Sequence, residues 1–268
     1  MAAFLHDPSE ASLLAAIDRN WRASMRAFGQ APHVHLRDDD HVFWFITGVP
    51  DSAFNSIMYA RLTPDQIAPE VLELQTLRST HTVPMNWLVG PDSRPTDLGP
   101  HLVTCGLQHF IDLPLMTVKL DRLHSDRLPP ANLTIEVVES DSVWAEWIIA
   151  EQRGYEVDST LGSSLTTLRT GMGASSHHLR LYHYLGRLDG HPVATASLLP
   201  SEGIAGIYDV TTVPSARKRG VGTAMMLHIL HMAQQQGYHH AWLQPSEMAY
   251  PFYERLGFQV CGVCSIYG

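Results

Sequence analysis

Apolar positions along the first half of the chain recur with helical spacing in some windows and as short continuous runs in others. A helix is predicted to begin after Asp7, with Pro8 at its first position and Glu10 completing a capping box, and to end at Gly29. The same half is predicted to contain a strand over residues 42–46, a helix over 64–78 after Thr63, a strand over 84–89, a short helix over 98–105 and a strand over 115–120.

The second half of the chain alternates strand-like and helix-like windows. Asp189 and Gly190 separate two strand-like runs, and this dipeptide is a strong hairpin signal. The predicted elements are a strand over 133–138, a helix over 143–153, a hairpin over 179–188 and 192–199, a strand over 204–213, a helix ending at Gly237, a strand over 240–244, a helix over 249–256 and a strand over 258–266.

A change of composition between these halves indicates a domain boundary. Pro129 and Pro130 cannot pair inside a sheet. We therefore expect a smaller α/β domain over residues 1–128 and a second domain over 133–268. The fold class is α/β with a mixed sheet.

Two segments of the chain resemble each other. Trp87 begins a strand–loop–helix unit that closes on Gly106, and Trp242 begins a similar unit that closes on Gly257. Two interpretations stay open, a shared fold in both halves or a coincidence between two ordinary units.

Charge and composition narrow the class of protein. The chain has 18 Lys and Arg against 27 Asp and Glu, a net charge of −9, so a nucleic-acid partner is not expected. No apolar run has the length of a membrane span, and no signal peptide is evident, so neither a membrane partner nor secretion is expected. Three cysteines cannot form a disulfide framework. We expect a cytoplasmic protein.

The segment over residues 207–223 carries the clearest chemistry. A β-branched strand runs into a turn with Gly220 and Gly222, and a helix begins at once. This arrangement points backbone N–H groups and a positive helix end at one place, which favours a polyphosphate. The dinucleotide fingerprint does not fit because position 225 is methionine. The P-loop does not fit because Gly222 is followed directly by Thr223, with no lysine between them.

The residues Arg217-Lys218-Arg219-Gly220-Val221-Gly222 match R-x-x-G-x-G, which resembles the pyrophosphate loop of the GNAT superfamily of acyl-CoA-dependent N-acyltransferases. Residues 249–258 are similar to that family's A-x-x-x-Y-x-x-x-G-F segment. The resemblance covers about residues 133–268 and implies a GNAT-like fold there. The N-terminal half is then a candidate degenerate copy, which lacks the glycine loop.

The resemblance implies that acetyl-CoA is the acyl donor and that no metal is needed. Ser246 stands where the family often has an asparagine that contacts the cofactor, and its alternative role is to cap the helix. The implied cofactor-binding residues are Thr212 and Val213 for the pantetheine arm, Lys218, Arg219, Gly220, Val221, Gly222 and Thr223 for the pyrophosphate, and Arg217 and Ser246 beside them.

The resemblance places Tyr253 where the family often has a phenol that protonates the leaving thiolate, and the alternative is a core aromatic. Asp209 is our first choice for a base, on one face of its strand with Thr211 and Val213, and a structural carboxylate is the alternative. Pro251 requires that its helix begin near Tyr250 or be kinked.

These features together predict an N-acetyltransferase that acts by direct attack of a primary amine, on a small-molecule or peptide acceptor. The alternatives are an acyl-CoA-binding sensor and a non-catalytic module. The stretch over residues 159–176, rich in Gly, Ser and Thr, is predicted to be either a cover over the acceptor site or a plain connection. A homodimer is a further option.

Overall fold

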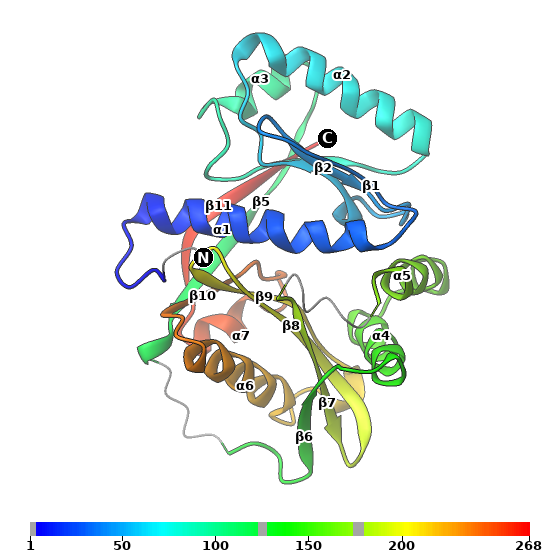
Figure 1. Ribbon diagram of the computed structural model, residues 1–268, viewed down its shortest axis with the longest axis vertical. Helices are drawn as coiled ribbons and strands as arrows, with labels where there is room; N and C mark the ends of the chain where they lie inside the picture. The colour runs from blue at the N-terminus through cyan, green and yellow to red at the C-terminus, as the bar shows by residue number, and fades with distance from the viewer. Residues whose placement is uncertain (1–3, 123–127, 174–179) are drawn as a thin grey trace.

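One continuous β-sheet runs through the whole molecule and carries helices on both faces (Figure 1). The computed structural model describes residues 4–122, 128–173 and 180–268. The strand order is β1-β2-β3-β4-β11-β5-β10-β9-β8-β7-β6. The strands are β1 (His35–Asp38), β2 (Phe43–Ile46), β3 (Asn55–Met58), β4 (Asn86–Val89), β5 (His109–Lys119), β6 (Leu133–Val137), β7 (Tyr182–Leu188), β8 (His191–Ser201), β9 (Ile204–Thr212), β10 (His240–Leu243) and β11 (Gln259–Tyr267).

The helices match the predicted ones with two differences. The first helix begins after Ser9, whose hydroxyl accepts the Ser12 N–H, so the cap predicted at Asp7 is wrong. It changes to 3-10 geometry over Arg26–Gln30, so Gly29 lies within that turn. The predicted stretch 159–176 is helical over most of its length, and residues 174–176 lie outside the described part. The helices are α1 (Glu10–Met25), α2 (Pro64–His81), α3 (Leu98–Thr104), α4 (Asp141–Tyr155), α5 (Ser159–Met172), α6 (Val221–Gln235) and α7 (Tyr250–Arg255).

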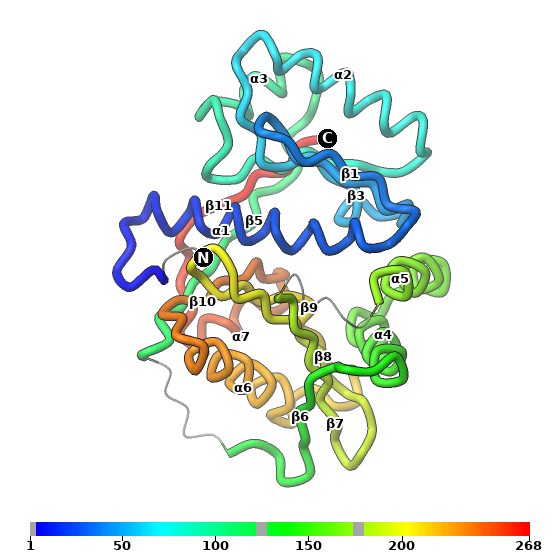
Figure 2. The backbone as a smooth tube through the Cα atoms, in the orientation of Figure 1, coloured from blue at the N-terminus to red at the C-terminus, as the bar shows by residue number. Residues whose placement is uncertain are grey.

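The two halves of the chain exchange their last strands. Strand β11 lies between β4 and β5, and β5 in turn lies between β11 and β10, with all of these pairs antiparallel. The C-terminus consequently lies in the upper, N-terminal half of the molecule (Figure 2). The predicted division at residues 128 and 133 stays a prediction, because one sheet continues through both parts.

The internal resemblance corresponds to a repeated topology. Strands β4 and β10 are each followed by a short helix and a long strand, and each pairs in parallel with the strand before it. Trp87 and Trp242 occupy matching positions in these pairs, opposite Ile57 and Gly206, and both tryptophans are buried. Of the two interpretations that the sequence left open, the topology supports a shared fold, although the described residues of the N-terminal half contain no counterpart of β6.

The two faces of the sheet around β9 are covered by different helices. Ile207 belongs to the core cluster that α6 and α7 cover, whereas the neighbouring Tyr208 packs with residues of α1 on the opposite face. Helix α1, which belongs to the N-terminal half, thus crosses the middle of the molecule and packs on strands of the C-terminal half (Figure 1).

Asn20 of α1 joins the two halves. Its amide donates to the carbonyls of Leu199 and Ser201 at 3.0 and 3.1 Å, and its Oδ1 accepts from the Tyr208 hydroxyl at 2.7 Å and from Trp242 Nε1 at 2.9 Å. Asn20 is completely buried, and its side chain links the buried Trp242 N–H and the Tyr208 hydroxyl to the backbone at the end of β8.

We expect Asn20→Leu to lower the free energy of unfolding by about 3–5 kcal/mol, because several buried polar groups lose their partners together. For a chain of this size that corresponds to a melting temperature lower by roughly 10 °C. Thermal and urea unfolding measure it. Asn132→Ala is the control, since exposed Asn132 has a single bond, to Asp189, and should change stability by less than about 0.5 kcal/mol.

Asp18, on the same helix, is a buried carboxyl. Its Oδ2 accepts the Asp92 N–H at 2.7 Å, and burial raises its pKa to about 7. A carboxyl with a raised pKa stabilises the fold at low pH, and that contribution is lost as the pH rises toward 7.

We expect the ionisation of Asp18 alone to lower the free energy of unfolding of the wild type by roughly 3 kcal/mol as the pH rises from 5 to 8. Asp18→Asn keeps an acceptor for the Asp92 N–H and removes that share of the pH dependence. Urea unfolding of both proteins at the two pH values measures the difference, and parallel pH curves would contradict the assignment.

Candidate acyl-donor and acceptor site

Strands β9 and β10 pair only at their beginning. Their parallel pairing involves Ala205 with Ala241 and Gly206 with Trp242, and it does not extend along the rest of β9. On its other side β9 stays paired with β8 up to Thr212. The backbone of β9 from Ile207 onward therefore has one edge free of pairing with β10, which is where an extended ligand could pair as an added strand.

A β-bulge lies at the point where the strands separate. Thr195 pairs with Thr211, and Ser197 pairs with Tyr208, so β9 has one residue more than β8 between these pairs. Asp209 lies in the bulge with a φ of 52°, a conformation that aspartate tolerates better than most residues. The bulge directs the Asp209 and Thr211 side chains to the face covered by α4, as predicted. Val213, predicted to share that face, follows the end of β9 and packs in the cluster on the α6 side.

The loop between β9 and α6 ends at Gly220, the N-cap residue of α6. Gly220 has a φ of 83° and no side chain to cap the helix, so the amides of Val221, Gly222 and Thr223 have no partner within the helix. Lys218 also has a positive φ, of 60°. A Cβ at Gly222 would lie 3.4 Å from Thr212 Oγ1, which places this helix end beside the end of β9.

Arg217 has other contacts than the sequence suggests. Its guanidinium donates to the carbonyls of Thr212 and Gly154 and to the Glu156 carboxylate, at 3.0, 2.7 and 2.7 Å. These bonds tie the loop to the end of β9 and to the end of α4. Lys218 and Arg219 follow Arg217 in the loop, and Arg219 is exposed.

Ser246 lies in the turn before α7, where its hydroxyl accepts the Ala249 N–H at 3.3 Å. This bond closes the turn before the helix, whose N-cap residue is Ala249, so Ser246 does not cap α7 itself. Helix α7 begins at Tyr250 with Pro251 in its first turn, so the helix is short and starts where the first of the two predicted options placed it.

Tyr253 on α7 is buried, and its ring packs edge-on to Phe258. Within the described residues, no protein group forms a hydrogen bond with its hydroxyl. Burial raises the pKa of Tyr253 above its usual value, so the phenol stays protonated at neutral pH. A protonated phenol without a protein partner is suited to donate a proton.

Asp209 belongs to a network of side chains from five elements. Its Oδ1 accepts from Arg169 Nη2 on α5, and its Oδ2 accepts from the Ser197 hydroxyl on β8, both at 2.8 Å. Ser197 Oγ in turn lies 2.7 Å from His183 Nδ1. The Arg169 guanidinium also bonds to Glu151 on α4.

The order of these contacts decides what chemistry they allow. Ser197 lies between His183 and Asp209, whereas a serine nucleophile requires the histidine between the serine and the carboxylate. The network therefore holds Asp209 in place and does not activate Ser197. A fifth of the Asp209 side chain is exposed, and each of its oxygens has one protein partner, so a further hydrogen bond can be accepted.

Sequence reasoning missed Glu151, Arg169 and Tyr155. The buried positions of α4 include Trp144, Trp147, Ile148 and Glu151, so an acidic residue continues an apolar face. Arg169 similarly continues the apolar face of α5. A charged residue at such a position indicates a buried partner of opposite sign. The helical spacing of the apolar positions in the sequence therefore already indicated that both side chains are buried. Tyr155, the last residue of α4, is about half exposed as a residue. Desolvation of its hydroxyl, together with the nearby charges of Asp209 and Glu151, raises its pKa.

The corresponding region of the N-terminal half is closed by the chain itself. After β3, the Ala60 carbonyl accepts the Arg94 N–H at 2.8 Å, and the Leu62 N–H donates to the Arg94 carbonyl at 2.9 Å. Arg94 thus pairs with the residues that continue β3. The matching edge of β9, in the other half, has no such partner from β10. Helix α2 is capped by Thr63 and Gln66 in a capping box. In the described residues, the edge that follows β3 is therefore paired and the start of α2 is capped.

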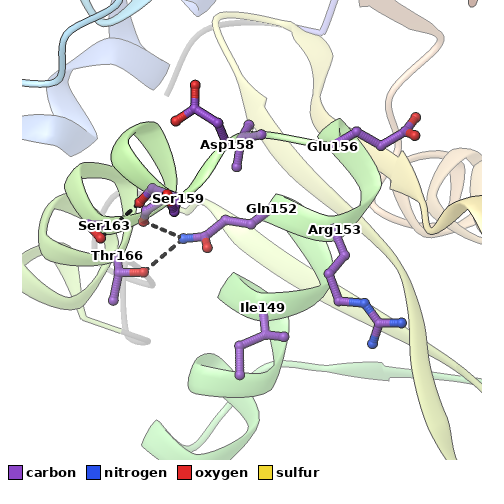
Figure 3. A pocket seen from close by; sticks show the side chains of 10 residues that line it. Ile149, Gln152, Arg153, Glu156, Asp158, Ser159, Ser163 and Thr166 are labelled. Atoms are coloured by element: carbon purple, nitrogen blue, oxygen red, sulfur yellow. Dashed lines mark hydrogen bonds between the residues drawn. The ribbon is translucent and has the colours of Figure 1, made fainter.

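Two surface hollows of about 340 Å³ each border α4. One contacts the glycine loop through Val213 and Arg219. The other lies between α4 and α5, where Gln152 donates to the Gly162 carbonyl and the Thr166 hydroxyl (Figure 3). These bonds fix α5 to α4, so the stretch predicted as a cover or a connection is largely a packed helix.

The described residues offer neither a cluster of metal ligands nor a membrane-spanning helix. In the described ranges, no three His, Cys, Asp or Glu side chains come together as a metal site would require. None of the helices there combines the length and the apolar character that crossing a membrane demands.

Comparison with known proteins matches residues 144–258 to the model of the acetyltransferase (GNAT) family. Streptothricin acetyltransferase from Streptomyces lavendulae is 34% identical over 62 residues, which cover 22% of this chain and 33% of that protein. Glucosamine 6-phosphate N-acetyltransferase from Trypanosoma brucei brucei is 32% identical over 77 residues, 26% of this chain and 52% of that protein. The chain thus matches between a third and about half of the length of these relatives.

Solved structures resemble the chain over both halves. A GCN5-related N-acetyltransferase from Kribbella flavida has a TM-score of 0.66 and 21% identity, over 93% of this chain and 94% of that one. A tandem GNAT protein from the clavulanic acid biosynthesis pathway has a TM-score of 0.58 and 14% identity, over 88% and 83%. At these identities the likeness shows the fold, which extends through the N-terminal half.

Proposed function

We propose, from the premise that residues 144–258 belong to the acetyltransferase (GNAT) family, that the chain transfers an acetyl group from acetyl-CoA to a primary amine. The observation that carries this proposal is the open edge of β9 beside the uncapped start of α6. An extended thiol-bearing arm with a diphosphate requires both features together.

In this proposal, the pantetheine arm pairs with the open edge of β9, which ends at Thr212, whose carbonyl already accepts from Arg217. Val213 does not pair with the arm, because its N–H donates to the Val193 carbonyl and its carbonyl accepts the Ala216 N–H, both at 2.9 Å. The amides from Lys218 to Thr223 bind the diphosphate, with the side chains of Lys218 and Arg219 adding positive charge. Arg217 supports the loop, because its guanidinium is engaged with Thr212, Gly154 and Glu156. The Ser246 hydroxyl accepts the Ala249 N–H and keeps its own proton to donate to the cofactor.

The chemical step is a direct attack. The amine nitrogen forms a bond to the thioester carbonyl carbon, and the carbon–sulfur bond breaks as CoA leaves. Tyr253 donates its proton to the departing thiolate, since its phenol is protonated and has no protein partner among the described residues. The phenolate regains a proton, directly or through water, from the nitrogen as the amide forms, so the products are the amide, the free thiol of CoA and the proton taken up by Asp209. Asp209 accepts a proton from the incoming ammonium, directly or through water. Its oxygens can do so because the bonds from Arg169 and Ser197 leave lone pairs free to accept a further hydrogen bond.

The acceptor is proposed to be a small molecule. The names of the two curated relatives state small acceptors, streptothricin and glucosamine 6-phosphate. The N-terminal half contributes walls to this side of the sheet, since Phe28 lies 5.9 Å from the Arg169 guanidinium, measured to the ring centre. Because that half closes its own strand edge, we propose a single acetyl-CoA site for each chain.

The test combines binding and turnover. Calorimetric titration with acetyl-CoA is expected to give one site per chain, and a panel of small primary amines is expected to include at least one that releases the free thiol of CoA. Binding with no thiol release on any amine would favour an acyl-CoA-binding sensor. No binding at all would favour a non-catalytic module.

A further inference from the structure

Three buried charges beside the bulge of β9 do not balance. The side chains of Arg169 and Glu151 are 4% and 2% exposed, and that of Asp209 is 20% exposed. When both carboxyls are ionised, the cluster carries one more negative charge than positive. Buried charges usually occur in balanced pairs, so the excess needs a partner.

The contacts show which carboxylate holds the excess charge. Glu151 accepts from two nitrogens of Arg169, Nη2 and Nε, the second at 3.3 Å. Asp209 accepts from Nη2 alone, which it shares with Glu151. Glu151 therefore has two hydrogen bonds to Arg169 against one for Asp209, and the single guanidinium is shared between the two carboxylates. Asp209, the most exposed of the three, thus keeps part of its negative charge uncompensated.

We propose that Glu151 is a positioning residue that neutralises Arg169 and so leaves the negative charge of Asp209 available to a cationic acceptor amine. Glu151 acts through Arg169 and does not touch the acceptor. This inference rests on the proposed function, since it assigns the charge of the acceptor to that same site.

A pH dependence follows from the burial of Glu151, which raises its pKa to about 7. The groups that face it are Arg169 from α5, Asp209 from β9 and Tyr155 from its own helix, and His183 from β7 connects to Asp209 through Ser197. As the pH falls below 7, Glu151 takes up a proton, and Arg169 then neutralises Asp209. An aliphatic amine stays cationic throughout this range, so its own titration does not interfere.

The test measures KM and kcat for the amine of the panel that gives the highest kcat/KM. We expect Glu151→Gln to raise the acceptor KM at pH 8 by about tenfold, with the acetyl-CoA KM unchanged. We also expect the wild-type acceptor KM to rise as the pH falls through 7, and this rise to be absent in the variant. Glu146→Gln is the matched control, because Glu146 lies on the same helix in a more exposed pair with Arg187.

An acceptor KM equal to that of the wild type in Glu151→Gln, or a wild-type KM that is flat from pH 6 to pH 8, would overturn the inference while the acetyltransferase activity stands. If the variant does not fold, the wild-type pH profile alone decides. Failure of the proposed function gives a different result, namely no thiol release by the wild type on any amine, and the inference then falls with it.

Discussion

Gly222→Asp is expected to raise the dissociation constant of acetyl-CoA on the order of 100-fold or more. The amide of Gly222 is one of the first three of α6, which have no capping side chain and no partner within the helix. A carboxylate at this position places a negative charge where a diphosphate is proposed to bind, and it also offers its own oxygens to the free amides. Both effects oppose the ligand.

The control separates charge from size. A Cβ at Gly222 would be 3.4 Å from Thr212 Oγ1 and 3.8 Å from Phe252 Cζ, which are ordinary contact distances. Gly222→Ala should therefore fold and retain most of the affinity. Calorimetry on both variants measures the effect, with circular dichroism to establish that Gly222→Asp is folded. Equal affinity of Gly222→Asp and the wild type would exclude this helix end as the diphosphate site.

The elements set by local chemistry could be predicted from the sequence. The Asp189-Gly190 turn and the Thr63-Pro64 helix start are examples, and each appears at the predicted place. Strands β1 and β3 were not predicted, because each has four residues and neither has a clear alternation of apolar and polar positions. Their pairing with β2, a strongly apolar strand, decides their conformation.

The exchange of β5 and β11 could not be predicted, because it depends on which distant strands pair. Pro114 illustrates this, since the predicted strand began after it and the observed one runs through it. β10 pairs only with residues 116–119 of β5, so Pro114 lies where one edge of β5 has no β10 partner and its missing N–H costs little.

The candidate site was accessible from the sequence where a motif fixes the backbone, and not where side chains from distant elements meet. Gly220 and Tyr253 belong to local motifs. Arg169 approaches Asp209 only because α5 packs on α4 and β9 is bulged. The sequence signalled that Glu151 and Arg169 were buried charges, but only the fold shows that they are partners.

Tyr253→Phe is expected to lower kcat by a factor of about 10²–10⁴, the range for loss of a general acid, and to leave the affinity for acetyl-CoA within about twofold. The ring keeps its packing against Phe258 in the variant, and no hydrogen bond to a described protein group is lost. The fold should therefore not change. Removing the phenol leaves the thiolate to depart without its proton, which raises only the barrier to breaking the carbon–sulfur bond.

A second tyrosine provides the control. The Tyr238 hydroxyl donates to the Pro200 carbonyl at 2.6 Å, so Tyr238→Phe removes a phenol that has a structural partner. This variant should lose some stability and keep its kcat, the opposite of Tyr253→Phe. The thiolate of CoA is less basic than an amine, so its departure needs a proton donor less as the pH rises. The loss of kcat in Tyr253→Phe should therefore shrink as the pH rises toward the pKa of the thiol. A pH-independent loss shared by kcat and binding would instead assign Tyr253 to the core alone.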